Sequence, residues 1–259
     1  MNIIVCIKQV PDTTEVRIDP VKGTLVRDGV PSIMNPDDKA GLEVALSIKD
    51  KYDSKITVVT MGPPQAEEIL REAYAMGVDE AILITDRAFG GSDTWATSST
   101  LAAAIKKLDY DLIIMGRQAI DGDTAQVGPE TAEHLGLPNI SYAQSVEIDG
   151  NEVIVMRHHD NCIHKIRAKM PLVVTTMSEY NVPRYMTPGG IFDAYQKEII
   201  HLNRLDIDVK DQNIGLKGSP TKVSKSFPKS VKEPGMKIEK STDESVQFIL
   251  DKLKETYII

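Results

Sequence analysis

Cysteine is scarce in this sequence: Cys6 and Cys162 are the two that its 259 residues contain. They lie far apart, and neither belongs to a pair with the spacing of a redox motif or a zinc site. This scarcity excludes a small disulfide-stapled scaffold of the kind found among secreted proteins. We interpret both residues as buried or incidental thiols.

Long apolar runs are absent as well. No stretch of about 18 apolar residues occurs, and the first residues have the character of a strand instead of a charged segment followed by an apolar one. We therefore expect no transmembrane segment, no export signal and a cytoplasmic protein.

Positive charge is in deficit, because 30 Lys and Arg residues stand against 38 Asp and Glu residues, which gives a formal net charge of −8. A protein that binds nucleic acid without sequence preference needs the opposite balance. The composition therefore argues against nucleic acid and leaves small ligands and other proteins as binding partners.

Recognisable catalytic patterns are missing too. The sequence contains no nucleophile elbow and no evident pair of catalytic carboxylates. The nearest approach to a metal-binding pattern comprises His158, His159, Cys162 and His164, but no second cluster completes a set of four ligands. We expect neither a zinc site nor a self-contained hydrolase.

Strand-like and helix-like segments alternate through the first half of the chain. Apolar or β-branched runs typical of buried strands cover residues 2–7, 55–61, 80–85 and 111–115. Segments typical of helices lie between them, at residues 36–52, 66–76 and 94–108. Such alternation requires parallel pairing with right-handed crossovers. We predict an α/β fold with a doubly wound, mostly parallel sheet, and such sheets bind ligands beyond the carboxyl ends of their strands.

Turn and cap signals support these boundaries. Asn35 suits the N-cap of the first helix and Pro36 its first position, with two Asp residues in the first turn. Gly77 is placed to end the second helix. Several turn dipeptides within residues 9–31 predict a small hairpin over the edge of the domain.

The pattern changes in the second half of the chain. Short β-rich runs at residues 140–148, 152–158 and 162–168 predict an antiparallel ribbon, and residues 172–177 are apolar enough to return to the main sheet. Helical periodicity is then nearly absent until residue 242. Residues 211–234 bury little apolar surface by themselves.

The chain ends in a predicted amphipathic helix at residues 242–257, whose apolar face comprises Val246, Ile249, Leu250 and Leu253. We therefore divide the chain into an α/β domain with a β-rich extension at residues 1–200 and a C-terminal arm at residues 201–259. Such an arm suits a heterodimer in which it wraps the other subunit. The alternative is an arm that packs back on its own domain.

The loop at residues 116–130 connects the fourth strand to a helix. Free backbone N–H groups and the positive end of the helix dipole would meet there, which favours a phosphate. Gly116 and Gly122 allow close approach of the backbone, while Thr124 and Gln126 offer side-chain donors. The alternative is a loop whose aspartates merely cap the helix.

A second polar loop, at residues 86–98, follows the third strand. Gly90 and Gly91 give its backbone freedom, and Asp93 can cap the following helix. Thr94 and Thr97 fall one helical turn apart, so their hydroxyl groups can point the same way and hydrogen-bond a planar ring. A capped helix with a buried Phe and Trp explains the same residues without a ligand.

Residues 116–128, Gly-Arg-Gln-Ala-Ile-Asp-Gly-Asp-Thr-Ala-Gln-Val-Gly, resemble the signature of the electron-transfer flavoprotein beta subunit. Segments at residues 5–12, 34–38, 60–65 and 182–185 match the same family in the same order and cover nearly the whole chain. The resemblance implies nucleotide contacts at the following positions: Cys6, Asn35, Pro36, Asp37, Asp38, Met61, Ala119, Ile120, Asp121, Gly122, Asp123, Thr124, Ala125, Gln126, Val127, Gly128, Pro129 and Glu130.

The loop at residues 86–94 resembles the electron-bifurcating members of the family, which carry FAD where respiratory members carry AMP. We add Asp93, Thr94 and Thr97 as contacts of the flavin ring. The resemblance implies NADH as electron donor, ferredoxin or flavodoxin as one-electron acceptor, and an alpha subunit whose FAD passes electrons to a flavin dehydrogenase. A non-bifurcating beta subunit with structural AMP and a non-redox adenine-nucleotide sensor are the alternatives.

The family's dehydrogenase-recognition segment matches residues 179–194. Its middle departs from the respiratory pattern, so the implied dehydrogenase is one for acyl-CoA or a different flavin enzyme. The partner contacts implied here are Pro183, Arg184, Tyr185, Pro188, Ile191 and Phe192.

Overall fold

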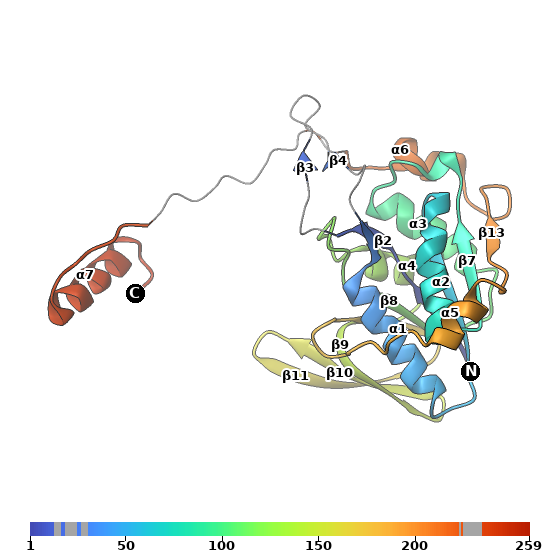
Figure 1. Ribbon diagram of the computed structural model, residues 1–259, viewed down its shortest axis with the longest axis horizontal. Coiled ribbons are helices and arrows are strands. Elements are labelled where there is room, and N and C mark those ends of the chain that lie inside the picture. Colours follow the sequence, from blue (N-terminus) through green and yellow to red (C-terminus); the bar gives the residue numbers. More distant parts are fainter. Residues whose placement is uncertain (13–16, 19–24, 27–30, 223, 225–234) are drawn as a thin grey trace. The chain divides into compact units, whose positions relative to one another are not determined.

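The computed structural model describes residues 1–12, 31–222, 224 and 235–259, together with the backbone of residues 17–18 and 25–26 (Figure 1). It divides into two compact units, Met1–Lys225 and Ser226–Ile259. No helix among the described residues is both long and apolar enough to cross a membrane.

A nine-stranded sheet with the order β11-β10-β9-β12-β8-β1-β6-β7-β13 forms the centre of the first unit. Its parallel part consists of β1 (Asn2–Cys6), β6 (Lys55–Met61), β7 (Glu80–Ile84), β8 (Leu112–Gly116), β12 (Leu172–Thr176) and β13 (Ile200–Leu202). The chain leaves β1 toward β6 on one side and returns to β8 on the other. The doubly wound, mostly parallel sheet is therefore confirmed, and its topological switch point lies between β1 and β8.

Helices cover both faces of this sheet. One buried cluster joins one face to α1 (Pro36–Lys49) and α2 (Glu67–Met76), after the short helix η2 (Pro64–Ala66). A second cluster joins the other face to α3 (Thr94–Ile105) and α4 (Val127–Leu135). Successive strand residues alternate between the two clusters, which is why the central strands read as unbroken apolar runs.

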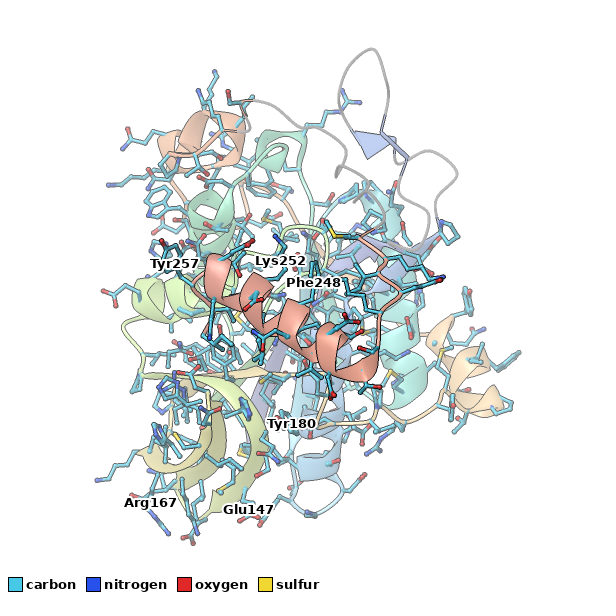
Figure 2. All side chains as sticks on the ribbon, turned by 90° about the vertical axis from the view of Figure 1, so that its left-hand side faces the viewer. Glu147, Arg167, Tyr180, Phe248, Lys252 and Tyr257 are labelled. Carbon is cyan, nitrogen blue, oxygen red and sulfur yellow. The ribbon has the colours of Figure 1, made fainter. Side chains whose placement is uncertain are left out.

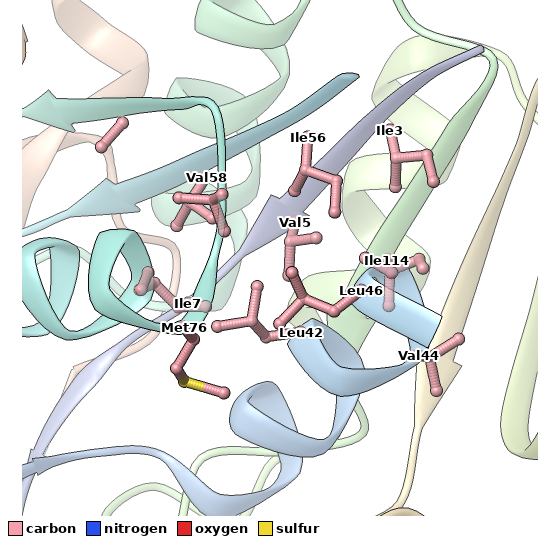
Figure 3. Close-up of a cluster of buried hydrophobic side chains, with 14 of the residues drawn as sticks. Ile3, Val5, Ile7, Leu42, Val44, Leu46, Ile56, Val58, Met76 and Ile114 are labelled. Atoms are coloured by element: carbon pink, nitrogen blue, oxygen red, sulfur yellow. The ribbon is translucent and has the colours of Figure 1, made fainter. Parts of the chain in front are cut away.

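The first cluster shows how closely α1 sits on the sheet. Leu42 and Leu46 of α1 point toward Ile3 and Val5 of β1 and toward Ile114 of β8 (Figure 3). All five side chains are at most 2% exposed. The position of α1, whose first turn faces the strand ends, is thus fixed by close packing.

The β-rich extension is an antiparallel ribbon of β9 (Asn139–Asp149), β10 (Glu152–His159) and β11 (Cys162–Lys169), in which β9 pairs in parallel with β12. Val153 and Val155 are buried in the first cluster, whereas β11 is largely exposed at the free edge of the sheet. Arg167 of this edge strand binds Asp149 and Glu152 (Figure 2). The predicted ribbon and the return of β12 to the main sheet are both confirmed.

Short strands flank the first β–α connection. β2 (Gln9–Pro11) pairs with β5 (Ser32–Met34), and β3 (Arg17–Ile18) pairs with β4 (Leu25–Val26), each in antiparallel fashion. These pairs agree with the hairpin predicted for residues 9–31. The rest of that prediction lies outside the described residues.

The structure corrects the prediction of little regular structure after residue 180. It contains α5 (Pro188–Ala194), β13, the short helix η4 (Asp211–Asn213) and α6 (Gly215–Gly218). The expected domain boundary at residue 200 lies inside the first unit, because β13 pairs with β7 and Ile214 is buried in the second cluster. The sequence does not reveal these elements, because each of them is too short to show a clear period of apolar residues.

The second unit contains α7 (Thr242–Glu255), which starts with a capping box between Ser241 and Glu244. The predicted helix is thus present, although it ends at Glu255 instead of residue 257. Its Val246 and Ile249 are more than half exposed. On another face Phe248 lies 6.0 Å from the ammonium group of Lys252 (Figure 2). Within the second unit, the apolar face of α7 is thus only partly covered.

Replacing Leu42 by Ala tests how far the sheet depends on α1. We expect the free energy of unfolding to fall by about 2–5 kcal/mol, because the substitution leaves a cavity in a fully buried cluster. The matched control is Leu205→Ala, since Leu205 is 84% exposed and should cost at most about 0.5 kcal/mol. Urea denaturation measures both. Equal losses would contradict the packing role assigned to α1.

Candidate functional site

A cavity of about 870 Å³ opens at the carboxyl ends of the central strands. Its lining comes from the ends of β1, β6 and β8 and from the loop after β7. Residues 85–94 form one wall, and residues 115–128 form another. The cavity thus lies at the switch point of the sheet, and its volume is in the upper part of the range of about 300–1,000 Å³ typical of small-molecule sites.

The wall formed by the loop between β8 and α4 presents a row of backbone donors. The N–H groups of residues 124–128 donate no hydrogen bond within the described part of the chain. Asp123 and Ala125 have φ values of +49° and +53°, which turn successive peptide groups into a concave arrangement. Such a nest at the start of a helix binds anionic oxygens, so the residues present fit a phosphate group.

Two glycines let this wall approach its neighbours. A Cβ atom on Gly128 would lie 2.5 Å from Cγ2 of Thr175 in β12. One on Gly116 would lie 2.1 Å from the Asp38 carboxylate. By contrast, Gly122 has open space around it. The close packing of the cavity wall therefore depends on Gly116 and Gly128, whereas the sequence had drawn attention to Gly116 and Gly122.

The first turn of α1 holds the strand ends in place. Asn35 occupies the N-cap position but makes no capping hydrogen bond with its side chain. Its amide instead donates to the carbonyl of Gln118 at 2.8 Å and accepts from the N–H of Ile120 at 3.1 Å. The expected side-chain cap is thus corrected: the buried amide is used to fix the loop between β8 and α4.

Asp38 joins the strands on both sides of the switch point. Its carboxylate accepts the N–H groups of Lys8, at 2.8 Å, and Gly116, at 3.0 Å. Burial is the main reason that its pKa is raised to about 7. Burial, followed by the charge of Asp38, also raises the pKa of Cys6 to about 12. The floor of the cavity therefore carries a protonated thiol at neutral pH and no reactive thiolate.

Asp37 links the cavity wall to the segment after β12. One carboxylate oxygen accepts the N–H of Ser178 at 3.0 Å, and the other lies 3.2 Å from Nε of Arg117 without hydrogen-bond geometry. Arg117 lines the cavity, and its guanidinium also lies 3.7 Å from the Glu179 carboxylate. Arg117 thus lies between the buried Asp37 of α1 and the exposed Glu179 at the start of the predicted partner segment.

The opposite wall begins at η3 (Arg87–Phe89). Phe89 is buried, and Thr94 and Thr97 both line the cavity from the first turn of α3. The Thr94 hydroxyl group lies 3.2 Å from Oε1 of Gln126, which joins the two walls. Asp93 caps α3 by accepting the N–H of Ala96, as predicted, so its carboxylate already has protein partners.

The predicted contact residues fall into two groups. Those that line the cavity are Cys6, Asp38, Met61, Asp93, Thr94, Thr97, Ala119, Gly122, Thr124, Ala125, Gln126, Val127 and Gly128. Those that do not line it are Asn35, Pro36, Asp37, Ile120, Asp121, Asp123, Pro129 and Glu130. The second group supports the first: Glu130 accepts from Thr94 and Ser98, for example.

Sequence reasoning missed three cationic residues of the lining, Lys8, Arg87 and Arg117. Lys8 directly follows a predicted parallel strand, and Arg87 and Arg117 each lie two residues beyond the predicted end of one. The rule that ligands bind at the carboxyl ends of parallel strands could therefore have identified them. Lys8 is paired with Asp121 at 2.6 Å.

The predicted partner segment lies outside the cavity. Arg184 is tied to α1 through Glu43 and Asp50, and these carboxylates raise its pKa. Beside this anchor, Tyr185 is 95% exposed and Phe192 is 71% exposed. Pro183 is half-buried, whereas Pro188 and Ile191 are exposed. The segment therefore displays Tyr185 next to an anchor on α1, and Phe192 on α5, which packs against α2.

The fold and the cavity define a doubly wound α/β protein with a ligand site at its switch point. The chain belongs to the electron transfer flavoprotein family, since the electron transfer flavoprotein domain matches residues 22–206. It is 57% identical over 259 residues to the electron transfer flavoprotein subunit beta of Clostridium acetobutylicum, with both chains covered completely. The resemblance to beta subunits is thereby confirmed.

Of two further relatives, one is named as a subunit of a reductase complex, and the name of the other mentions no complex. The chain is 51% identical over 262 residues to the caffeyl-CoA reductase-Etf complex subunit CarD of Acetobacterium woodii, and both chains are covered completely. It is 39% identical over 260 residues to protein FixA of Bradyrhizobium diazoefficiens. This match covers 97% of this chain and 90% of that protein.

Replacing Asp38 by Asn tests the raised pKa at the cavity floor. A carboxyl group with a higher pKa in the folded than in the unfolded chain stabilises the fold below pH about 4, and this contribution is lost as the pH rises through about 7. We therefore expect the stability of the wild type relative to D38N to fall over this range, by on the order of a few kcal/mol.

Urea unfolding at several pH values between about 4.5 and 7.5 measures this difference. Asp109→Asn, at an exposed position, makes the same chemical change away from the cavity and controls for it. A wild type and a D38N variant with parallel pH profiles would show that Asp38 titrates normally.

Proposed function

We propose that this chain is the beta subunit of a heterodimeric electron transfer flavoprotein and that it binds FAD in the cavity at the switch point. The observation that carries the proposal is the row of unpartnered N–H groups at residues 124–128, which faces a cavity of about 870 Å³. The oxygens of an anionic pyrophosphate can accept hydrogen bonds from these N–H groups. The cavity extends from there to the second wall, which leaves room for the rest of a dinucleotide. Family membership supports a redox role.

The two walls divide the work of binding. The nest at residues 124–128 holds the phosphates through backbone donors, so it needs no charged side chain. Cys6 and Met61 offer small or flexible apolar surface at the ends of β1 and β6. Thr94 and Thr97 line the second wall, and in this proposal their hydroxyl groups hydrogen-bond a ring that lies along it. The buried Asp38 keeps both sides of the switch point at a fixed separation.

Bound FAD would supply the redox chemistry, accepting a hydride from NADH and passing electrons singly to ferredoxin or flavodoxin and to the FAD of the alpha subunit. The protein's own contribution is to orient the cofactor and exclude water from it. The exposed aromatic residues of the segment anchored by Arg184 suit the docking of a flavin dehydrogenase. The exposed apolar face of α7 suits contact with the alpha subunit.

A subunit that carries AMP is the second candidate. The nest and the floor of the cavity are sufficient for a mononucleotide, and Asp93 at the second wall is already engaged by protein donors. In that case the second wall would contact no ligand. The subunit would assist electron transfer by a flavin that its partner holds, and it would not bifurcate electrons.

Counting cofactors in the purified heterodimer tests the proposal. We expect two FAD molecules for each complex of this chain with its alpha subunit, and we expect NADH to bleach the visible absorbance. One FAD with one AMP would overturn bifurcation and leave the family role intact. A colourless chain that retains AMP or ATP and does not associate with an alpha subunit would instead favour a nucleotide sensor.

Replacing Gly128 by Ala tests the phosphate-binding wall. The new Cβ atom would clash with Thr175, so the start of α4 must move away from β12 and carry the donor row with it. We expect nucleotide affinity to fall about tenfold or more, which corresponds to about 1.4 kcal/mol. Equilibrium dialysis with FAD and with AMP measures it.

Gly189→Ala is the matched control, because Gly189 lies outside the cavity and has open space around it. Its affinity should equal that of the wild type. Unchanged affinity in G128A would place the phosphate elsewhere.

A further inference from the structure

Residues 211–221, which the sequence assigned to a partner-wrapping arm, pack against the second wall of the cavity. Ile214 is 4% exposed and Ser219 is 6% exposed. The segment contains η4 and α6, and it contacts the loop between β7 and α3 through side chains and backbone. This burial is unexpected for a linker, and it places the segment directly behind residues that line the cavity.

Backbone hydrogen bonds tie this segment to the loop. The N–H of Gly215 donates to the Ser92 hydroxyl oxygen at 3.1 Å, and the N–H of Leu216 donates to the carbonyl oxygen of Gly90 at 3.1 Å. A third bond runs the other way, from the N–H of Asp93 to the Ser219 hydroxyl oxygen at 2.8 Å. The loop is thus bound along its whole length after η3.

Asp93 extends this connection into α3. One of its carboxylate oxygens accepts both the N–H and the hydroxyl of Thr221, at 2.8 and 2.7 Å. The other accepts the N–H of Ala96 at 3.0 Å and caps the helix. Burial raises the pKa of Asp93, but these donors outweigh that effect and hold the pKa below its usual value. Thr221 therefore acts, through a charged carboxylate, on the helical turn that carries Thr94 and Thr97.

The close contact depends on two glycines. Gly215 has a φ of +59°, and a Cβ atom there would lie 2.1 Å from the carbonyl oxygen of Ala88. Gly91 has a φ of +75°, and a Cβ atom there would lie 3.2 Å from the Cβ atom of Leu216. Both conformations favour glycine, and a side chain at Gly215 would force the two backbones apart. Such packing defines the position of the wall to within a narrow range.

We propose that Ser219 and Thr221 are positioning residues that set the second wall of the cavity and thereby decide whether the site accepts a dinucleotide in addition to a mononucleotide. The inference rests on the proposed function, because it takes the nest at residues 124–128 as the phosphate site. A mononucleotide held there is covered by the first wall and the floor. The second wall meets only the part of a larger ligand that extends beyond its phosphates.

The test compares FAD and AMP binding to the full-length chain after bound nucleotide has been removed. Thr221→Val removes the hydroxyl donor to Asp93, and Ser219→Ala removes the acceptor for the Asp93 N–H. We expect the double variant to lose about tenfold in FAD affinity, as the loss of hydrogen bonds to a charged group implies, with AMP affinity within about twofold of the wild type.

Two further variants separate positioning from a general loss of structure. Thr221→Ser alone keeps the hydroxyl group, and this variant should bind FAD as tightly as the wild type. Thr256→Val makes the same Thr-to-Val change in the second unit and should leave both affinities unchanged. The ratio of FAD to AMP affinity is the decisive readout, because partial unfolding would weaken both ligands together.

Each outcome bears on the inference. A fall in FAD affinity alone supports it. If the wild type binds both ligands and the double variant changes neither affinity, or weakens both equally, the inference is overturned while the proposed function stands. If the wild type binds neither FAD nor AMP, the proposed function fails and the inference fails with it.

Discussion

The hydrogen bonds from the first turn of α1 to the strand ends are the constraint on which the remaining structure depends. Asn35, Asp37 and Asp38 are almost fully buried, and together they reach the ends of β1 and β8, the loop before α4 and Ser178 in the segment after β12. Buried polar groups need partners, and here side-chain oxygens of all three residues accept N–H groups near the carboxyl ends of the strands. The cavity keeps its shape because these bonds prevent the strand ends from closing over it.

The same helix serves the outer surface. The flank of α1 carries Glu43, which binds Arg184 of the partner segment, while its first turn carries Asp38 at the cavity floor. Arg117 makes a second link, from the cavity wall to Glu179. The ligand site and the segment proposed for docking are therefore supported by one rigid element, which is packed against β1 and β8 by Leu42 and Leu46.

Much of the fold follows from the sequence because its signals are local. The buried runs of β1, β6 and β8 and the Asn35-Pro36 start of α1 have clear periods and caps, and the structure agrees with them to within a few residues. β13, α6 and the burial of Ile214 were not predictable, because three or four residues form no period and their stability comes from distant partners. At the site, the sequence indicated the loops but not which side chains face the cavity: Asn35 and Asp37 are predicted contacts, yet they are not among the residues that line it.

The ribbon leaves β11 as the outermost strand, with a row of backbone groups that lack a neighbour in the sheet order. An uncovered strand of this kind invites another molecule to add its own strand and so begin aggregation. Lys165, Arg167 and Lys169 project from the same side of β11 at alternate positions and are all exposed. At the opposite end, β13 has only three residues. The charged side chains of β11 and the short length of β13 thus disfavour the pairing of other molecules with the two edges of this wide sheet.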